Sequence, residues 1–128
     1  MYRGENMTPR DISFERRYIE SAPEDIQRWF DLFKEKQNNC FKMLNENLYI
    51  LITLGEKASG GYQVEIKKIE KVDNLYNISY LIEYPKDEQA NITSFVYPYD
   101  LVVISQDDMN DFEKNKINED IIKFDLIK

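Results

Sequence analysis

Few residues in this sequence could carry chemistry. It contains no histidine and a single cysteine, Cys40. Without histidine there is no Ser–His or Cys–His nucleophile pair, and the commonest general base and metal ligand is also missing. The other candidate nucleophiles, Thr53 and Ser59, therefore have no histidine to activate them. We expect no enzymatic activity, and we interpret Cys40, next to Phe41 and near Met43, as a packed core thiol.

The acidic side chains do not have the spacing of a calcium loop. In the cluster at 107–111, a loop that begins at Asp107 has Met109 at a ligand position and Phe112 where glycine is needed. We therefore predict no metal and no cofactor. The formal net charge of −7 disfavours binding to nucleic acid or to anionic membranes, because both require a basic surface. No apolar run approaches the roughly 20 residues of a membrane-spanning helix, so we expect no membrane insertion.

Residues 49–62, Y-I-L-I-T-L-G-E-K-A-S-G-G-Y, organise the rest of the chain. The run at 48–54 has two apolar faces, which predicts a central strand covered on both sides. Gly55 ends the run, and a glycine-rich loop follows at 56–61. This loop is not a phosphate loop, because it lacks the G-K-[ST] ending and a helix after it. Residues 62–72 alternate like a half-exposed strand, and we interpret the two strands as a hairpin joined by the loop.

One amphipathic helix is predicted before the central strand. Residues 1–10 form a loose lead-in, and 11–18 alternate like an edge strand. The helix is predicted over 23–36, with Ser21 as its N-terminal cap and proline in its first turn. Its apolar stripe follows helical spacing, and we expect this stripe to pack on one face of the sheet. The stripe consists of Ile26, Trp29, Phe30 and Phe33.

Further strands are predicted at 40–44, 75–84, 92–97, 101–104 and 122–126. A bulge is expected near Lys67 and Lys68, and a compact turn at 73–74. An acidic helix is predicted from 105 to about 116. The whole chain, residues 1–128, is thus expected to form one α+β domain, with an acidic short helix and a terminal strand in 106–128. Its core would be a curled antiparallel sheet of six to eight strands, barrel- or sandwich-like, with the helix packed on it.

This series of features resembles the C-terminal domain of the PrcB family, which is named for an accessory subunit of a bacterial surface protease complex. The family pattern is an apolar strand, then G-x-K-x-T-G-G-Y, two further strands, and a late proline before a closing apolar strand. The resemblance covers roughly residues 20–105. Ser59 stands where the family has threonine, and Ala58 where it often has proline. The matching residues are Gly55, Lys57, Gly60, Gly61, Tyr62, Pro85 and Pro98.

The resemblance implies a non-enzymatic module that binds or stabilises a protein partner, and a protease is the partner it implies. We expect binding at the glycine-rich loop and the late proline segment, since loops on a rigid sheet commonly carry recognition. An alternative is that the paired glycines only satisfy turn geometry. The candidate binding residues are Gly55, Glu56, Lys57, Ala58, Ser59, Gly60, Gly61, Tyr62, Pro98 and Tyr99.

Two other functions stay open. The S-G-G-Y loop is similar to the T-T-G-Y-x-W loop of chagasin-like inhibitors of cysteine proteases, although the tryptophan is absent here. A cytoplasmic regulatory adaptor also fits the composition. The sequence as written starts without the apolar segment of a signal peptide, which predicts a cytoplasmic protein. A chain that had been shortened at its start would look the same, and related domains are often exported or lipid-anchored. The oligomeric state is left open.

Overall fold

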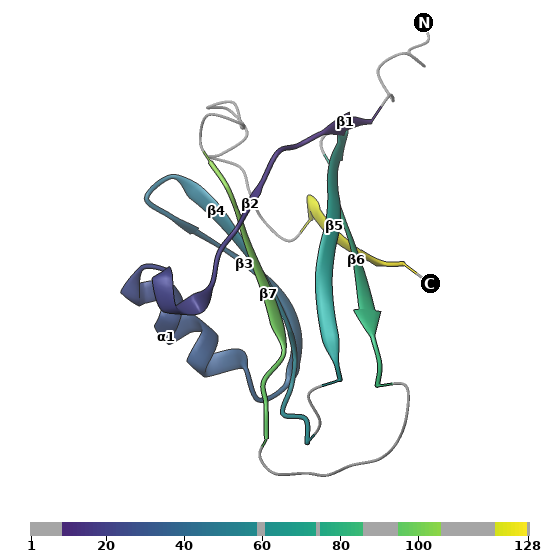
Figure 1. Ribbon diagram of the computed structural model, residues 1–128. Coiled ribbons are helices and arrows are strands. Elements are labelled where there is room, and N and C mark those ends of the chain that lie inside the picture. Colours follow the sequence, from purple (N-terminus) through teal and green to yellow (C-terminus); the bar gives the residue numbers. More distant parts are fainter. Residues whose placement is uncertain (1–8, 59–60, 74, 86–94, 106–119, 128) are drawn as a thin grey trace, which may run out of the picture.

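The computed structural model describes residues 9–58, 61–73, 75–85, 95–105 and 120–127. In these residues the chain forms eight strands, one α-helix and the short 3-10 helix η2 (Ile19–Ser21). Figure 1 shows two layers of strands, with the α-helix on the outer face of one of them. In chain order the elements are β1 (Arg10–Asp11), β2 (Glu15–Arg16), α1 (Glu24–Phe33), β3 (Gln37–Leu44), β4 (Asn47–Leu54), β5 (Gln63–Val72), β6 (Leu75–Glu83), β7 (Tyr99–Ile104) and β8 (Ile122–Leu126).

The strands form two four-stranded sheets, with the orders β1-β5-β6-β8 and β2-β7-β4-β3. The apolar core lies between them in a sandwich-like arrangement, since residues of β4 and β7 pack against residues of β5 and β6. Eight strands among the described residues agree with the predicted six to eight, but they form two sheets rather than one, and the prediction of an antiparallel sheet is wrong at one place. β8 pairs with β6 in parallel, because a long connection from β7, rather than a tight turn from β6, brings it there.

β4 is the central strand that the apolar run predicts. It pairs with β3 on one edge and with β7 on the other, and all seven residues at 48–54 are buried. Leu48, Ile50 and Ile52 belong to the core between the sheets, whereas Tyr49 and Leu51 pack under α1. The two apolar faces of the run therefore contact two different layers.

The helix stripe is core, as predicted. Ile26, Trp29 and Phe30 are buried against the outer face of β4 and β7, and Phe33 packs beside them partly buried. The predicted N-terminal cap is wrong. Pro23 occupies the cap position, and the Ser21 hydroxyl donates to the carbonyl of Tyr18, because η2 draws Ser21 into the preceding turn.

The predicted β4–β5 hairpin is wrong, since the two strands lie in different sheets. Both edges of β4 are already occupied by β3 and β7, so β5 has no free edge to pair with. β5 instead forms a hairpin with β6 through the predicted turn at 73–74, where Asp73 has a φ of 57°. The predicted bulge is confirmed by a register shift between Ile66 and Lys68.

The N-terminal segment connects the two sheets rather than forming one edge strand, which corrects the prediction for 11–18. β1 pairs with β5, and the Ile12 N–H donates to the carbonyl of Ile69. A few residues later β2 pairs with β7, and the Arg17 N–H donates to the carbonyl of Leu101. Figure 1 shows this segment crossing from one layer to the other.

The remaining predictions fall partly outside the described residues. In the strand predicted at 92–97, the described residues contribute a single β-bridge, between Val96 and Lys57. The acidic helix from 105 to about 116 and the cluster at 107–111 lie outside the described residues, Ser105 excepted. In the parts of the chain that the structure describes, no helix has the length and apolarity needed to cross a membrane.

Candidate functional site

Arg16 and Asp100 join the two sheets. Arg16 Nε donates to Asp100 Oδ1 at 2.8 Å, and Arg16 Nη2 donates to Asp100 Oδ2 at 2.8 Å. The Asp100 residue is only 5% exposed, whereas the Arg16 side chain is 41% exposed. The hydrogen bond to Asp100 raises the pKa of the Arg16 guanidinium above its ordinary value, so the guanidinium stays charged.

The same pair also binds the edge of β5. The N–H of Ile66 donates to Asp100 Oδ2 at 2.6 Å, and its carbonyl accepts a bond of 2.8 Å from Arg16 Nη2. β1 pairs with β5 only at Glu70 and Lys71 and does not reach Ile66. The side chains of Arg16 and Asp100 therefore satisfy the backbone groups of Ile66 in its place. The two sheets are therefore held together by a charged cluster at this point.

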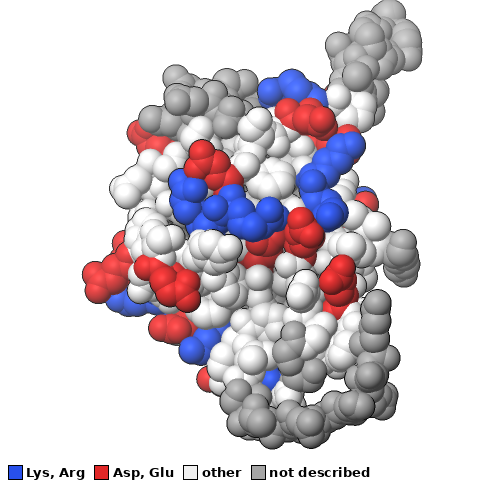
Figure 2. Space-filling model, viewed as in Figure 1, with Lys and Arg blue, Asp and Glu red and all other residues white. Residues whose placement is uncertain are grey.

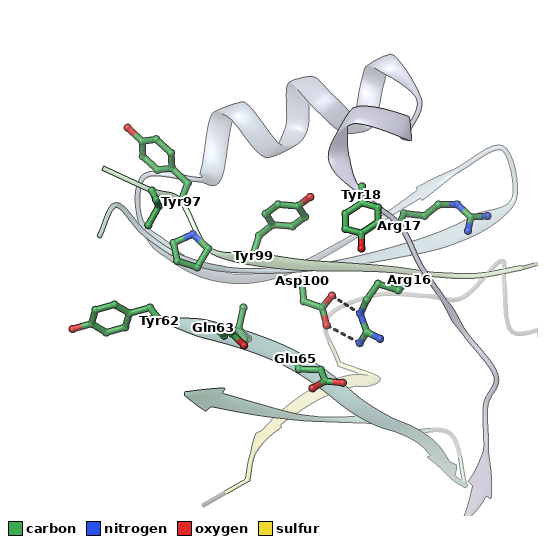
Figure 3. Close-up of a pocket in the computed structure, with 12 residues that line it drawn as sticks. Arg16, Arg17, Tyr18, Tyr62, Gln63, Glu65, Tyr97, Tyr99 and Asp100 are labelled. Carbon is green, nitrogen blue, oxygen red and sulfur yellow. Dashed lines mark hydrogen bonds and ion pairs between the residues drawn. The ribbon is translucent and has the colours of Figure 1, made fainter. Parts of the chain in front are cut away.

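Next to this cluster the two sheets enclose a cleft of about 640 Å³, lined by residues 16–18, 62–65 and 96–100. We call it the inter-sheet cleft. Figure 3 shows Tyr62, Gln63 and Glu65 on the β5 side of the cleft and Tyr97 and Tyr99 on the β7 side, where the Tyr99 ring points toward α1 and packs on Phe30. Its volume is within the range of ligand sites, roughly 300–1,000 Å³. Four tyrosines line it, which are Tyr18, Tyr62, Tyr97 and Tyr99.

The start of the glycine-rich loop is tied to the segment that precedes β7. Lys57 and Val96 exchange two backbone hydrogen bonds, of 2.9 and 2.8 Å. The Tyr97 hydroxyl donates to Glu56 Oε1 at 3.2 Å, and this bond raises the pKa of Tyr97. The Lys57 ammonium lies 4.9 Å from the centroid of the Tyr62 ring. The two predicted binding segments thus contact one another, although they are distant in sequence.

Two glycines of the loop have packing roles. Gly55 is buried with a φ of +90°, which favours glycine. At Gly61 a Cβ atom would lie 2.7 Å from Pro85 Cβ, so only glycine fits beside this proline. Both roles are structural, but neither concerns the turn geometry of the paired glycines, so the choice between a binding loop and a turn stays a prediction. Ser59 and Gly60 lie outside the described residues, and Ala58 is half-buried.

The structure brings Tyr62, Pro98 and Tyr99 into the lining of the inter-sheet cleft. Gly55, Glu56 and Lys57 lie outside the lining, and the last two bond to its residues Tyr97 and Val96. Sequence reasoning missed the rest of the lining, Arg16 and Asp100 above all. One signal was available: an aspartate directly before the buried run at 101–104 needs a cation, because buried charges are paired. The other missed residues are Arg17, Tyr18, Gln63, Val64, Glu65, Val96 and Tyr97.

Charges around the cleft occur in pairs of opposite sign. Arg17 Nη1 lies 2.7 Å from Glu15, and the Lys67 ammonium lies 3.3 Å from Glu65. In the space-filling view, basic and acidic side chains are mixed across this face (Figure 2). Burial raises the pKa of Tyr99, so its hydroxyl is protonated at neutral pH. Among the described residues no group of three His, Cys, Asp or Glu side chains has metal-binding geometry. The lining of the cleft thus combines tyrosine side chains with paired charges.

One protein family matches part of the chain. The family model described as PrcB C-terminal matches residues 48–105, the segment from β4 to the end of β7. Over this segment the chain matches the PrcB C-terminal family model, and the resemblance noted from the sequence is confirmed over these residues. No curated protein and no solved structure matches the chain. The segments that complete the inter-sheet cleft on the β2 side lie before the matched residues.

Proposed function

We propose that the protein is a non-enzymatic protein-binding module and that the inter-sheet cleft is its binding surface. The observation that supports this most is the joint lining of the cleft by Tyr62, Pro98 and Tyr99, which come from the two segments that the sequence predicts for binding. Tyrosines suit such a role, since they offer large contact areas with few rotatable bonds. The charged side chains near the cleft pair with one another, so we expect aromatic and polar contacts to recognise the partner.

A binding role without catalysis is supported by the state of the nucleophiles. Burial raises the pKa of the Cys40 thiol to about 11, which disfavours the reactive thiolate. Cys40 lies on the edge strand β3 and packs with the core under α1, and it is not part of the cleft lining. The Thr53 hydroxyl is buried and donates to the carbonyl of Lys36 at 2.7 Å. Neither residue faces the proposed binding surface.

The family match supports a protease or a protease complex as the partner. PrcB is the name of an accessory subunit of a bacterial protease complex, and the matched segment includes most of the cleft residues. In this proposal the domain stabilises or positions its partner through the cleft. The inhibitor and adaptor functions make different predictions, and the experiment below separates them.

Site-specific photo-crosslinking tests the proposal. A benzophenone amino acid is placed at Tyr18, which lines the cleft and is 71% exposed, or at Leu32, which is 78% exposed on α1. Each full-length protein is then irradiated in an extract of its native source. The proposal expects a protein adduct at position 18 that position 32 does not give, and a protease or its complex among the proteins identified by mass spectrometry.

The other outcomes are equally informative. Identical adducts at both positions would show that the cleft is not the binding surface. Inhibition of a papain-like protease by the purified protein would favour the inhibitor function. Substrate turnover by the purified protein would contradict the non-enzymatic proposal.

A further inference from the structure

Two strand edges border the inter-sheet cleft, and each offers backbone hydrogen-bonding groups to it. On β5, the N–H and C=O of Ile66 bond to Asp100 and Arg16, so they point away from β6. Backbone groups alternate sides along a strand, and pairing with β6 is regular from Gln63 to Ile66. The N–H and C=O of Val64 therefore also point away from β6, toward the cleft.

The same reasoning applies to β7. The carbonyl of Leu101 accepts a hydrogen bond from Arg17 N–H, so the backbone groups of Leu101 point toward β2. Two residues earlier, those of Tyr99 point to the same side, because pairing with β4 is regular from Tyr99 onward. β2 ends at Arg16, and the chain then turns away into η2. Within the described residues, no strand pairs with β7 at Tyr99 on this side or with β5 at Val64.

The N-terminal segment shows which kind of chain fits between these edges. β5 and β7 lie side by side, and the segment from Arg10 to Arg17 descends along them (Figure 1). It pairs antiparallel first with β5 and then with β7. The cleft begins where this extended backbone leaves the sheets at Tyr18. The cleft is lined by β5 and β7, the same two strands whose edges pair with the N-terminal segment at Arg10–Asp11 and Glu15–Arg16.

We propose, on the basis of the protein-binding function above, that the cleft binds an extended segment of a partner protein. The bound segment forms a short strand antiparallel to β7. It continues the path of the protein's own N-terminal segment, which turns away at Tyr18, and the edge of the bound strand that does not pair with β7 faces β5. Main-chain hydrogen bonds at Tyr99 and Val64 provide affinity in this mode, and pockets for side chains provide specificity. The rings of Tyr18 and Tyr62 contact the side chains of the segment.

Amide hydrogen exchange, measured residue by residue by NMR on the full chain, tests the proposal. The probe is the tightest binder selected from a displayed library of random linear peptides of about ten residues. We expect the amides of Tyr99, Val64 or both to exchange at least roughly 10-fold more slowly when the peptide is bound. The amides of Glu65 and Asp100 already point into the ladders with β6 and β4, so they serve as matched controls and should not change.

A second measurement uses the unaltered protein and modified peptides. Replacing single backbone N–H groups of the peptide by N-methyl groups should weaken binding roughly 10-fold or more at the positions that pair with the protein. If every N-methylated peptide binds like the parent, or neither strand edge gains protection, strand addition is wrong. Failure to select any binder would also overturn it. Protection that appears without peptide as protein concentration rises would assign the cleft to a second copy instead.

The two proposals can fail separately. A protein adduct at position 18 without protection of either edge would leave the protein-binding function standing and refute strand addition. Protection of the edges by the peptide, without any protein adduct at position 18, would support the peptide site and count against the proposed function.

Discussion

Arg16 and Asp100 are 84 residues apart in sequence, yet they form a doubly hydrogen-bonded ion pair between the two sheets. Asp100 is almost fully buried and also accepts the N–H of Ile66. Removing one partner of such a pair leaves an uncompensated buried group, which is much more costly than losing a surface ion pair. Arg16 and Asp100 also line the inter-sheet cleft.

Asp100→Ala is therefore expected to lower the free energy of unfolding by about 3 kcal/mol. This value is at the low end for the loss of one partner of a buried ion pair, because the remaining Arg16 side chain is partly exposed to water. Chemical denaturation measures this change. Arg28→Ala serves as the control: it removes exposed ion pairs with Glu24 and Asp25 and should cost less than about 0.5 kcal/mol. Equal losses for the two variants would contradict the role assigned to the pair.

Trp29→Ala should destabilise the protein by about 3–5 kcal/mol, because Trp29 packs its ring between α1 and the outer face of β4 and β7. The matched control is Leu32→Ala on the exposed side of the same helix, which should change stability by less than about 0.5 kcal/mol. Denaturant melts of both variants provide the test. A loss below about 1 kcal/mol for Trp29→Ala would show that the stripe is not core.

Gly61→Ala should destabilise the protein by about 1–3 kcal/mol, since the new methyl group would overlap Pro85 Cβ. Pro85→Gly removes the Pro85 Cβ atom, which the new methyl group at position 61 would overlap. The double variant should therefore recover part of the loss, as measured by thermal unfolding. If Gly61→Ala alone is as stable as the parent, close packing on Pro85 does not explain this glycine.

Cys40 should react slowly with iodoacetamide in the folded protein. With a pKa of about 11, roughly one thiol in a thousand is ionised at pH 8, and the rate in urea should be much higher. The raised pKa also means that burial of the neutral thiol stabilises the folded state fully below pH 9. This contribution is lost as pH rises through about 11. Equal labelling rates in buffer and in urea at pH 8 would contradict the burial of this group.

The sequence predicted those parts of the fold that local patterns determine. The apolar run at 48–54 identified the central strand, and the stripe from Ile26 to Phe33 identified the helix face that packs on it. The turn at 73–74 and the bulge at 66–68 were also local features. Each of these depends on residues a few positions apart, so periodicity is enough to reveal it.

Pairing between distant strands was not accessible in the same way. The glycine-rich loop is compatible both with a β4–β5 hairpin and with the observed connection between two sheets. The hairpin is excluded only because β3 and β7 occupy both edges of β4. For the same reason the lining of the cleft was predicted in part. Tyr62, Pro98 and Tyr99 belong to recognisable motifs, whereas Arg16 becomes part of the site only because the N-terminal segment crosses between the sheets.

The claim that the inter-sheet cleft is the binding surface is tested most directly by the affinity of the crosslinked partner for two charge-introducing variants. Tyr18→Asp places a carboxylate in the lining, and Leu32→Asp places one on the exposed side of α1. Both side chains are exposed, so both variants should melt like the parent. We predict that Tyr18→Asp raises the dissociation constant at least roughly 10-fold in calorimetric titration, a loss of about 1.4 kcal/mol, while Leu32→Asp leaves it unchanged. Equal affinities for the parent and Tyr18→Asp would contradict the assignment of the cleft.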